Sequence, residues 1–208
     1  MTEYYYIDTC SLQFRYLSGD PTATVDALLD DPDKIIFTAE LTLLEWSSTL
    51  ARTFRRKKIT YEDFKRNELA LMSDVVADKL RVLPPLTRAA EKARYLMEFV
   101  GVQHNLNLGS GDALHLVYAM HEASHLPGPV TMVTSNKAVA NIVKTLGLEL
   151  QLLHLKPTPP AIVTGKDYAS ILKGNTFTNQ SGEPLESCQD FIDAMDELKQ
   201  LRHRVGIL

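Results

Sequence analysis

Residues 130–153, VTMVTSNKAVANIVKTLGLELQLL, contain a strand, a helix and a second strand in close succession. Val130 to Thr134 is a short apolar run rich in β-branched residues, which favours a strand. Over 137–146 the apolar residues recur at helical spacing instead, and Gly147 follows as the expected C-cap. A further strand is expected over Glu149 to Leu153. Two strands joined by a helix are typical of a parallel sheet.

The same alternation extends from this segment towards the N-terminus. Further strands are expected over Tyr4 to Ile7, Lys34 to Phe37 and Leu80 to Leu83. Helical patterns occupy about 22–30, 39–57, 60–78, 87–100 and 112–124. The sequence therefore predicts an α/β fold, an α/β/α sandwich with a central, mostly parallel sheet of about five strands flanked by helices.

A change of composition after Leu155 divides the chain. Lys-Pro-Thr-Pro-Pro favours an extended linker, and a polar stretch with three glycines follows it. We therefore expect one domain over 1–155 and a Pro- and Gly-containing extension over 156–208. The extension is expected to end in an amphipathic helix, with Ser187 and Asp190 as its capping pair. Its apolar stripe would dock on the core or on a second subunit.

Composition excludes several classes of protein. With 208 residues, 45% hydrophobic and 23% charged, the chain is neither collagen-like, nor a coiled coil, nor fully disordered. No apolar run approaches the length of a membrane span and the start lacks a signal-peptide pattern, so we expect a cytoplasmic protein without a membrane partner. Cys10 and Cys188 are expected to be free thiols. A net charge of −4 argues against a large basic surface for coating DNA, yet it does not exclude nucleic acid.

Polar residues follow the predicted strands at four places, where an open parallel sheet binds its ligands. Asp8 and Thr9 follow the first strand. Thr38 ends the second strand as the expected N-cap of a helix that carries Glu45. Asp112 opens a later helix after Gly-Ser-Gly. The fourth place, after Val130 to Thr134, supplies the polar residues Thr134, Ser135 and Asn136.

Single acids have ordinary explanations that must be weighed. Asp112 could simply favour the dipole of its helix, an effect of about 0.3 to 1 kcal/mol. Glu45 differs, because Leu41, Leu44, Trp46 and Leu50 are expected to crowd apolar groups around it, and a buried acid is costly unless it is paired or bound to a cation. Together, Asp8, Glu45 and Asp112 at one sheet edge would repel each other unless a divalent cation neutralised them. Oxygen ligands alone point to Mg²⁺ or Mn²⁺, and such a site suits hydrolysis of a phosphate ester.

These four motifs, in this order, resemble the PIN domain, and among PIN domains most closely the VapC-type toxin ribonucleases. The resemblance rests on Ile-Asp-Thr near the start, Thr-Ala-Glu-Leu-Thr-Leu-Leu-Glu-Trp, Gly-Asp-Ala-Leu-His-Leu and Val-Thr-Ser-Asn-Lys, and it spans roughly 1–155. It implies a PIN-like fold and an endoribonuclease that depends on Mg²⁺ or Mn²⁺. It also implies the toxin half of a toxin–antitoxin pair, an RNA substrate, a cognate antitoxin and a homodimer.

The resemblance also implies roles for individual residues. Asp8, Glu45 and Asp112 would be the catalytic metal ligands, with Thr9, Thr134 and Ser135 in support. Asn136 stands where PIN domains commonly have a fourth acid, so it would be a weaker ligand through its carbonyl oxygen. Because Asn136 brings no charge, a weaker second metal, another metal preference and reduced activity all stay open. The extension beyond 155 is not covered by the resemblance.

A basic run closes the helix that carries Glu45 and consists of Arg52, Arg55, Arg56, Lys57 and Lys58. Cations are favourable at a helix C-terminus, so a solvated face explains the run as readily as RNA binding does.

Two alternatives to an active nuclease are weighed. A haloacid-dehalogenase-type phosphatase needs a second Asp two residues after the first, where this chain has Cys10. The other alternative is a catalytically weakened PIN-like module that binds RNA or acts as a scaffold, with Asn136 as its first sign. The three retained acids favour the nuclease.

Overall fold

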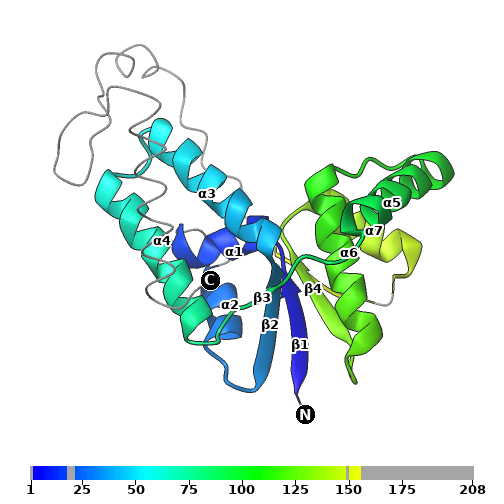
Figure 1. Cartoon of the computed structure of the whole chain (residues 1–208), viewed down its shortest axis with the longest axis horizontal. Helices are drawn as coiled ribbons and strands as arrows, with labels where there is room; N and C mark the ends of the chain where they lie inside the picture. Colours follow the sequence, from blue (N-terminus) through cyan, green and yellow to red (C-terminus); the bar gives the residue numbers. More distant parts are fainter. Residues whose placement is uncertain (1, 18–21, 149, 156–208) are drawn as a thin grey trace. The chain divides into compact units, whose positions relative to one another are not determined.

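The computed structural model describes residues 2–17, 22–148 and 150–155. These residues form a five-stranded sheet in which every neighbouring pair of strands is parallel. The strands are β1 (Glu3–Ile7), β2 (Lys34–Ala39), β3 (Arg81–Leu83), β4 (Val130–Thr134) and β5 (Gln151–His154). Their order across the sheet is β3-β2-β1-β4-β5, so β1 is central (Figure 1).

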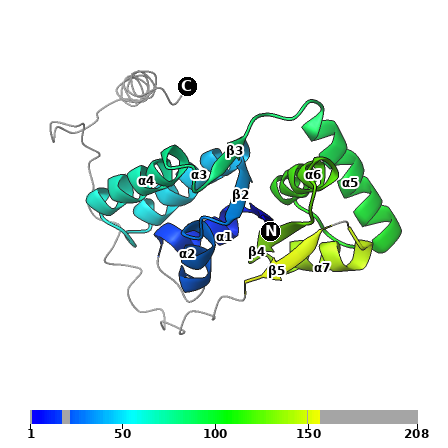
Figure 2. The ribbon, with the colours of Figure 1, turned by 90° about the horizontal axis from the view of Figure 1, so that it is seen from below.

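Helices cover both faces of the sheet (Figure 2). One layer contains α1 (Thr9–Tyr16), α2 (Thr22–Leu29), α3 (Glu40–Arg55) and α4 (Tyr61–Val76). The other contains α5 (Ala89–His104), α6 (Ser110–His125) and α7 (Lys137–Leu146). The predicted α/β/α sandwich with a parallel five-stranded sheet is confirmed.

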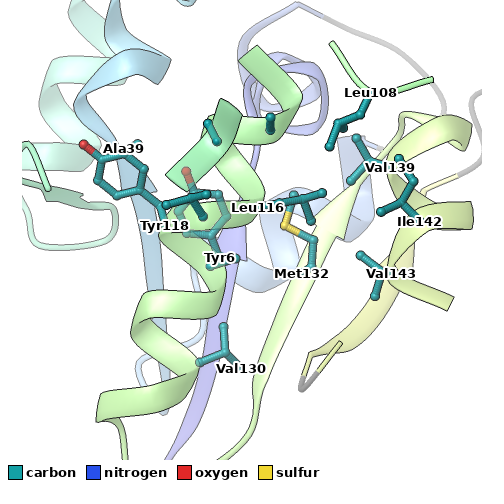
Figure 3. Close-up of a cluster of buried hydrophobic side chains, with 14 of the residues drawn as sticks. Tyr6, Ala39, Leu108, Leu116, Tyr118, Val130, Met132, Val139, Ile142 and Val143 are labelled. Atoms are coloured by element: carbon teal, nitrogen blue, oxygen red, sulfur yellow. The ribbon is translucent and has the colours of Figure 1, made fainter. Parts of the chain in front are cut away.

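The two layers are built on alternating side chains of the strands. In β1, Tyr6 packs towards α6 and α7, whereas Ile7 packs towards α1 to α4. Figure 3 shows the core on the α6 and α7 side of the sheet, in which Tyr6 and Met132 lie beneath Leu116 of α6. Because successive residues of a strand point to opposite faces, a short apolar run suffices to bury both sides of the sheet. The fully buried side chains in the other core include Trp46, Leu50 and Leu71.

Local signals explain several element ends, and two expectations need correction. Gly147 ends α7 in the left-handed conformation at φ 55°, as predicted for a C-cap. Thr38 was expected to cap α3, but it lies within β2, and its hydroxyl donates to the Ile7 carbonyl at 2.9 Å. The N-cap is Ala39, whose side chain makes no capping hydrogen bond. The helix α1 was not predicted at all.

Some sequence predictions lie outside the described residues, namely the extension 156–208, its C-terminal helix and Cys188. Cys10 is a free thiol, as expected. Among the described residues, no helix is long and apolar enough to cross a membrane.

Candidate active site

Asp8 occupies the central position at the carboxyl edge of the sheet, directly after β1. Its Oδ1 atom caps α1 by accepting from the backbone N–H of Ser11 at 2.9 Å, and it also accepts from Cys10 Sγ at 3.0 Å. Burial raises the pKa of the Cys10 thiol to about 12, so the thiol keeps the proton that it donates. Asp8 is only 2% exposed, and its other oxygen, Oδ2, has no hydrogen-bond partner among the described residues. A buried carboxylate oxygen without a donor is costly, which suits this atom to a cation.

Glu45 projects from the second turn of α3 towards the same edge. Its Oε2 accepts from the hydroxyl of Thr9 and from Nε2 of His115, the latter at 2.9 Å. The hydrogen bond from His115 lowers the pKa of Glu45 against the opposing effect of burial, so the carboxyl group is ionised at neutral pH. The side chain is 33% exposed. Of the apolar neighbours expected around it, Trp46 and Leu50 are buried, but Leu44 is 70% exposed and faces away.

Asp112 lies in the first turn of α6, as predicted, and interacts with both other acids. Burial raises its pKa, and the negative charges of Asp8 and Glu45 raise it further. Its Oδ2 accepts from the side-chain amide of Asn136 at 2.9 Å, which opposes that shift. The repulsion expected from the sequence between carboxylates at this edge is therefore present.

Asn136 has two hydrogen-bonding roles in the structure. Its Oδ1 accepts from the backbone N–H of Ala138 at 2.9 Å and so caps α7. Its amide nitrogen, a donor, faces Asp112. The oxygen that was expected to bind a metal accepts the capping hydrogen bond of α7, and the amide nitrogen holds Asp112 in place.

The Thr134 and Ser135 hydroxyls hydrogen-bond to backbone groups beside the site. Thr134 is fully buried, and its hydroxyl accepts from the backbone N–H of Asn136 at 3.0 Å. Ser135 donates to the Cys10 carbonyl at 3.0 Å. The first bond lies within the turn between β4 and α7, and the second joins that turn to Cys10 at the start of α1.

Two residues of the site were missed in the sequence. His115 is buried behind Glu45, and the hydroxyl of Tyr6 lies 2.8 Å from its Nδ1. The signal for His115 was available, because it follows Asp112 by three residues and thus lies on the same face of a helix. Tyr6 lies in the predicted first strand, where no local pattern indicates a partner more than 100 residues away.

Gly111 allows α6 to approach Glu45 closely. A Cβ atom at this position would lie 2.7 Å from Oε1 of Glu45, closer than real Cβ contacts allow. The Glu45 carboxylate can therefore keep this position beside the first turn of α6 because residue 111 has no side chain.

The donor set was tested for its fit to a divalent cation. Each of the three acids uses one oxygen in hydrogen bonds with the described chain: Oδ1 of Asp8, Oε2 of Glu45 and Oδ2 of Asp112. Within the described ranges, no three His, Cys, Asp or Glu side chains are grouped closely enough to hold a metal ion together. Mg²⁺ is usually bound by one or two carboxylates and several waters, so the unpartnered oxygen of Asp8 with one further carboxylate fits such an ion.

The basic run lies at the far end of α3. Arg52, Arg55, Arg56, Lys57 and Lys58 are all exposed. Arg52 donates to the Thr49 hydroxyl at 3.1 Å. At 1.5 Å per residue, Arg55 lies about 15 Å along the helix from Glu45.

Comparisons with known proteins bear on the fold. No protein-family model matches the sequence, and a search of curated proteins gives no match. Among solved structures, FitAcB from Neisseria gonorrhoeae is similar over 72% of this chain and 96% of its own, at 14% identity and a TM-score of 0.52. FitAB bound to an IR36 DNA fragment is similar over 73% and 97%, at 14% identity and a TM-score of 0.50. VapBC2 from Rickettsia felis, bound to a DNA fragment from its promoter, reaches a TM-score of 0.49 at 16% identity.

At such low identity the likeness concerns the fold alone. FitAB contains a PIN domain, and the likeness covers 96% and 97% of the two matched chains. The architecture and the order of the four motifs therefore lead to one conclusion: the chain has the PIN-domain fold.

Proposed function

We propose that this chain is an endoribonuclease that hydrolyses RNA phosphodiester bonds with Mg²⁺ or Mn²⁺, and that it is the toxin component of a toxin–antitoxin system. The observation that carries the proposal is Asp8, a buried carboxylate with one unpartnered oxygen beside two further acids. The PIN-domain fold shared with FitAB supports the toxin role. A cognate antitoxin, a homodimer and a cytoplasmic location belong to the same proposal.

In the proposed mechanism Asp8 and one further carboxylate would bind the cation directly, and the third acid of the set Asp8, Glu45 and Asp112 would reach it through a water that the ion keeps. When bound, the cation supplies an activated water and stabilises the charge that develops on the phosphate. The chain itself fixes its carboxylates: Thr9 and His115 hold one oxygen of Glu45, and Asn136 holds one oxygen of Asp112. The exposed cations of the basic run would bind RNA phosphates.

The first test is a calorimetric titration of Mn²⁺ into the metal-free full chain. We expect the wild type to bind and Asp112→Asn to lose most of its affinity, because the variant removes one charge from the ligand set. Asp33→Asn, which neutralises an exposed acid before β2, serves as the matched control and should bind like the wild type. Absence of wild-type binding at millimolar Mn²⁺ would overturn the metal-dependent mechanism.

The second test is cleavage of pooled RNA by the wild type and by Asp8→Asn. Asn caps helices as well as Asp does, so α1 should be retained while the charge is lost. We expect cleavage by the wild type and none by the variant.

A second function is supported by one observation. Asn136 brings no charge to the position of a fourth acid and points a donor into the site. This favours a weakened PIN-like module that binds RNA or acts as a scaffold. For such a module, Asp8→Asn would leave RNA binding unchanged and the wild type would not cleave RNA at any Mn²⁺ concentration.

A further inference from the structure

His115 connects the central strand of the sheet with Glu45. It is 3% exposed, and both of its ring nitrogens have partners. Nδ1 lies 2.8 Å from the Tyr6 hydroxyl of β1, and Nε2 lies 2.9 Å from Oε2 of Glu45 on α3. The Thr9 hydroxyl lies 3.3 Å from the same Nε2. One side chain of α6 thus joins groups from β1, α1 and α3.

The chemistry of the partners fixes where the protons lie. An ionised Glu45 can only accept, so Nε2 of His115 carries the proton between them. Burial, followed by the negative charge of Asp8, raises the pKa of Tyr6 well above its ordinary value, so its hydroxyl keeps a proton to donate. The hydrogen bonds therefore run from Tyr6 to His115 Nδ1 and from His115 Nε2 to Glu45.

This arrangement holds the carboxylate in one orientation. The donors Thr9 and His115 converge on Oε2, while Oε1 lies against the side-chain-free Gly111. Rotation of the imidazole would break its bonds to Tyr6 and Glu45 together. Tyr6 cannot move, because it is fully buried and its strand is paired on both sides.

We infer that His115, backed by Tyr6, is the positioning residue for Glu45 and presents the Oε1 side of that carboxylate to a divalent cation. The inference rests on the proposed function, since it assigns His115 a role in the same metal site. Partners that orient metal ligands in this way typically change metal affinity by about 10- to 100-fold when they are removed.

The competing explanation is a buried histidine that only stabilises the core. Both explanations expect that removing His115 lowers the melting temperature. Only positioning expects a change in metal affinity that depends on Glu45, because a core defect would act whether or not the Glu45 carboxylate is present.

The experiment titrates Mn²⁺ into the metal-free full chain by calorimetry and records thermal unfolding without metal. His115→Leu keeps the bulk and removes both hydrogen bonds. His115→Gln retains a donor for Glu45 and an acceptor for Tyr6, and Tyr6→Phe removes only the hydroxyl. His121→Gln, on the same helix but in contact with His125, is the control.

We expect His115→Leu to weaken Mn²⁺ binding by about 10- to 100-fold. His115→Gln should recover most of that loss, Tyr6→Phe should lose less than His115→Leu, and the control should bind like the wild type. In a Glu45→Gln background, His115→Leu should cause no further loss of affinity.

Three outcomes would overturn the inference, and they are distinguishable. Wild-type binding together with unchanged affinity in His115→Leu overturns the positioning role alone, as does an equal loss in the Glu45→Gln background. A wild type that binds no Mn²⁺ overturns the proposed function and the metal-site role with it.

Discussion

At the scale of single residues, the side-chain amide of Asn136 links the start of α7 to Asp112 of α6. Its oxygen caps α7 and its nitrogen holds Asp112, an acid whose pKa is raised by burial and by its acidic neighbours. A neutral donor at this position reduces the repulsion that a fourth acid would increase. Asn at this position therefore stabilises the metal-free protein, but it contributes no negative charge to the binding of a cation.

Asn136→Asp tests this balance. Asp still caps α7, but it removes the donor to Asp112 and places a second negative charge beside it. We expect the free energy of unfolding of the metal-free protein to fall by about 2 kcal/mol at pH 7, the scale of a hydrogen bond to a charged group. Chemical denaturation with and without Mn²⁺ measures this loss, and Mn²⁺ should restore more stability to the variant than to the wild type.

Asn136→Ser is the control, because Ser also caps helices but brings neither the amide donor nor a charge. Burial, and then repulsion by the neighbouring acids, raises the pKa of Asp112. The cost of repulsion is therefore present above that pKa and is relieved as the pH falls below it. The difference in unfolding free energy between Asn136→Asp and Asn136→Ser should therefore disappear at acidic pH. A gap that persists at pH 3 would show that repulsion is not its cause.

Sequence reasoning located the acids but not their partners. Asp8 was predicted because it directly follows a parallel strand, and Asp112 because it opens a helix after Gly-Ser-Gly. The direction of the Asn136 amide depends on the cap of α7, a three-dimensional choice between two nearly identical ends of the side chain. Tyr6 and His115 pair across 109 positions, a separation that no local pattern reports.

At the scale of elements, α1 shows why a helix can escape prediction. Its eight residues, TCSLQFRY, contain few apolar residues at helical spacing, and short helices are marginal by themselves. The helix is stabilised by tertiary contacts: the Asp8 cap, the buried Leu12 and the ion pairs of Arg15. The Arg15 guanidinium binds Asp26 of α2, Asp30 and Asp74 of α4 at 2.9, 2.9 and 3.1 Å.

Arg15→Gln should release α1 from α2 and α4. Asp74 is largely buried and would keep only the Tyr16 hydroxyl, so we expect a loss of about 2 to 3 kcal/mol of unfolding free energy at pH 7. Arg81→Gln breaks an exposed pair with Asp78, which solvent screens, and should therefore cost far less. Urea denaturation of both variants gives the comparison, and equal losses would contradict a structural role for the Arg15 cluster.

The Arg15 cluster also predicts a dependence on pH. Hydrogen bonds from Arg15, and then from Lys79, lower the pKa of Asp30. A lowered pKa contributes stability that is present above the unfolded value of about 3.9 and is lost as the pH falls towards the folded value. The stability gap between wild type and Arg15→Gln should be constant above about pH 5 and should shrink below about pH 4. A gap that widened in acid would contradict this assignment.

At the start of α6, one substitution should lower activity without lowering stability. Gly111→Ala improves helix propensity by up to about 1 kcal/mol, while its Cβ would force the flexible end of Glu45 to move. We expect an unchanged or higher melting temperature together with about a 100-fold loss of RNA cleavage, the cost of a displacement near 1 Å. Gly101→Ala, whose nearest contact would be at 4.0 Å, is the control. A fully active Gly111→Ala would refute the close fit.

At the scale of the whole molecule, topology explains why motifs more than 100 residues apart share one site. With β1 in the centre and β2 and β4 on its two sides, the loops after these strands lie next to one another. This much follows from a parallel sheet, and so the edge could be predicted from the sequence alone. The path of RNA across the surface could not be predicted, because it depends on how exposed charges on separate helices are arranged.

The basic run at the end of α3 predicts one direction for the bound RNA, and this prediction can be tested. If RNA extends from the acidic edge along α3, then Arg55→Gln, Arg56→Gln and Lys58→Gln together remove three phosphate contacts. For single-stranded RNA the slope of log K against log salt concentration should become shallower by about 2, and affinity should fall most at low salt. Fluorescence anisotropy of a labelled RNA across a series of KCl concentrations measures the slope.

The matched control neutralises Lys92, Arg94 and Lys144, three exposed cations of the opposite helical layer. It changes the net charge by the same amount, so any effect of overall charge should appear in both triple variants. Only the α3 variant should flatten the slope, because counterion release reports cations that contact phosphate rather than the mean charge of the protein. Equal slopes in the two variants would mean that RNA binds elsewhere, and the solvated-face explanation of the basic run would then hold.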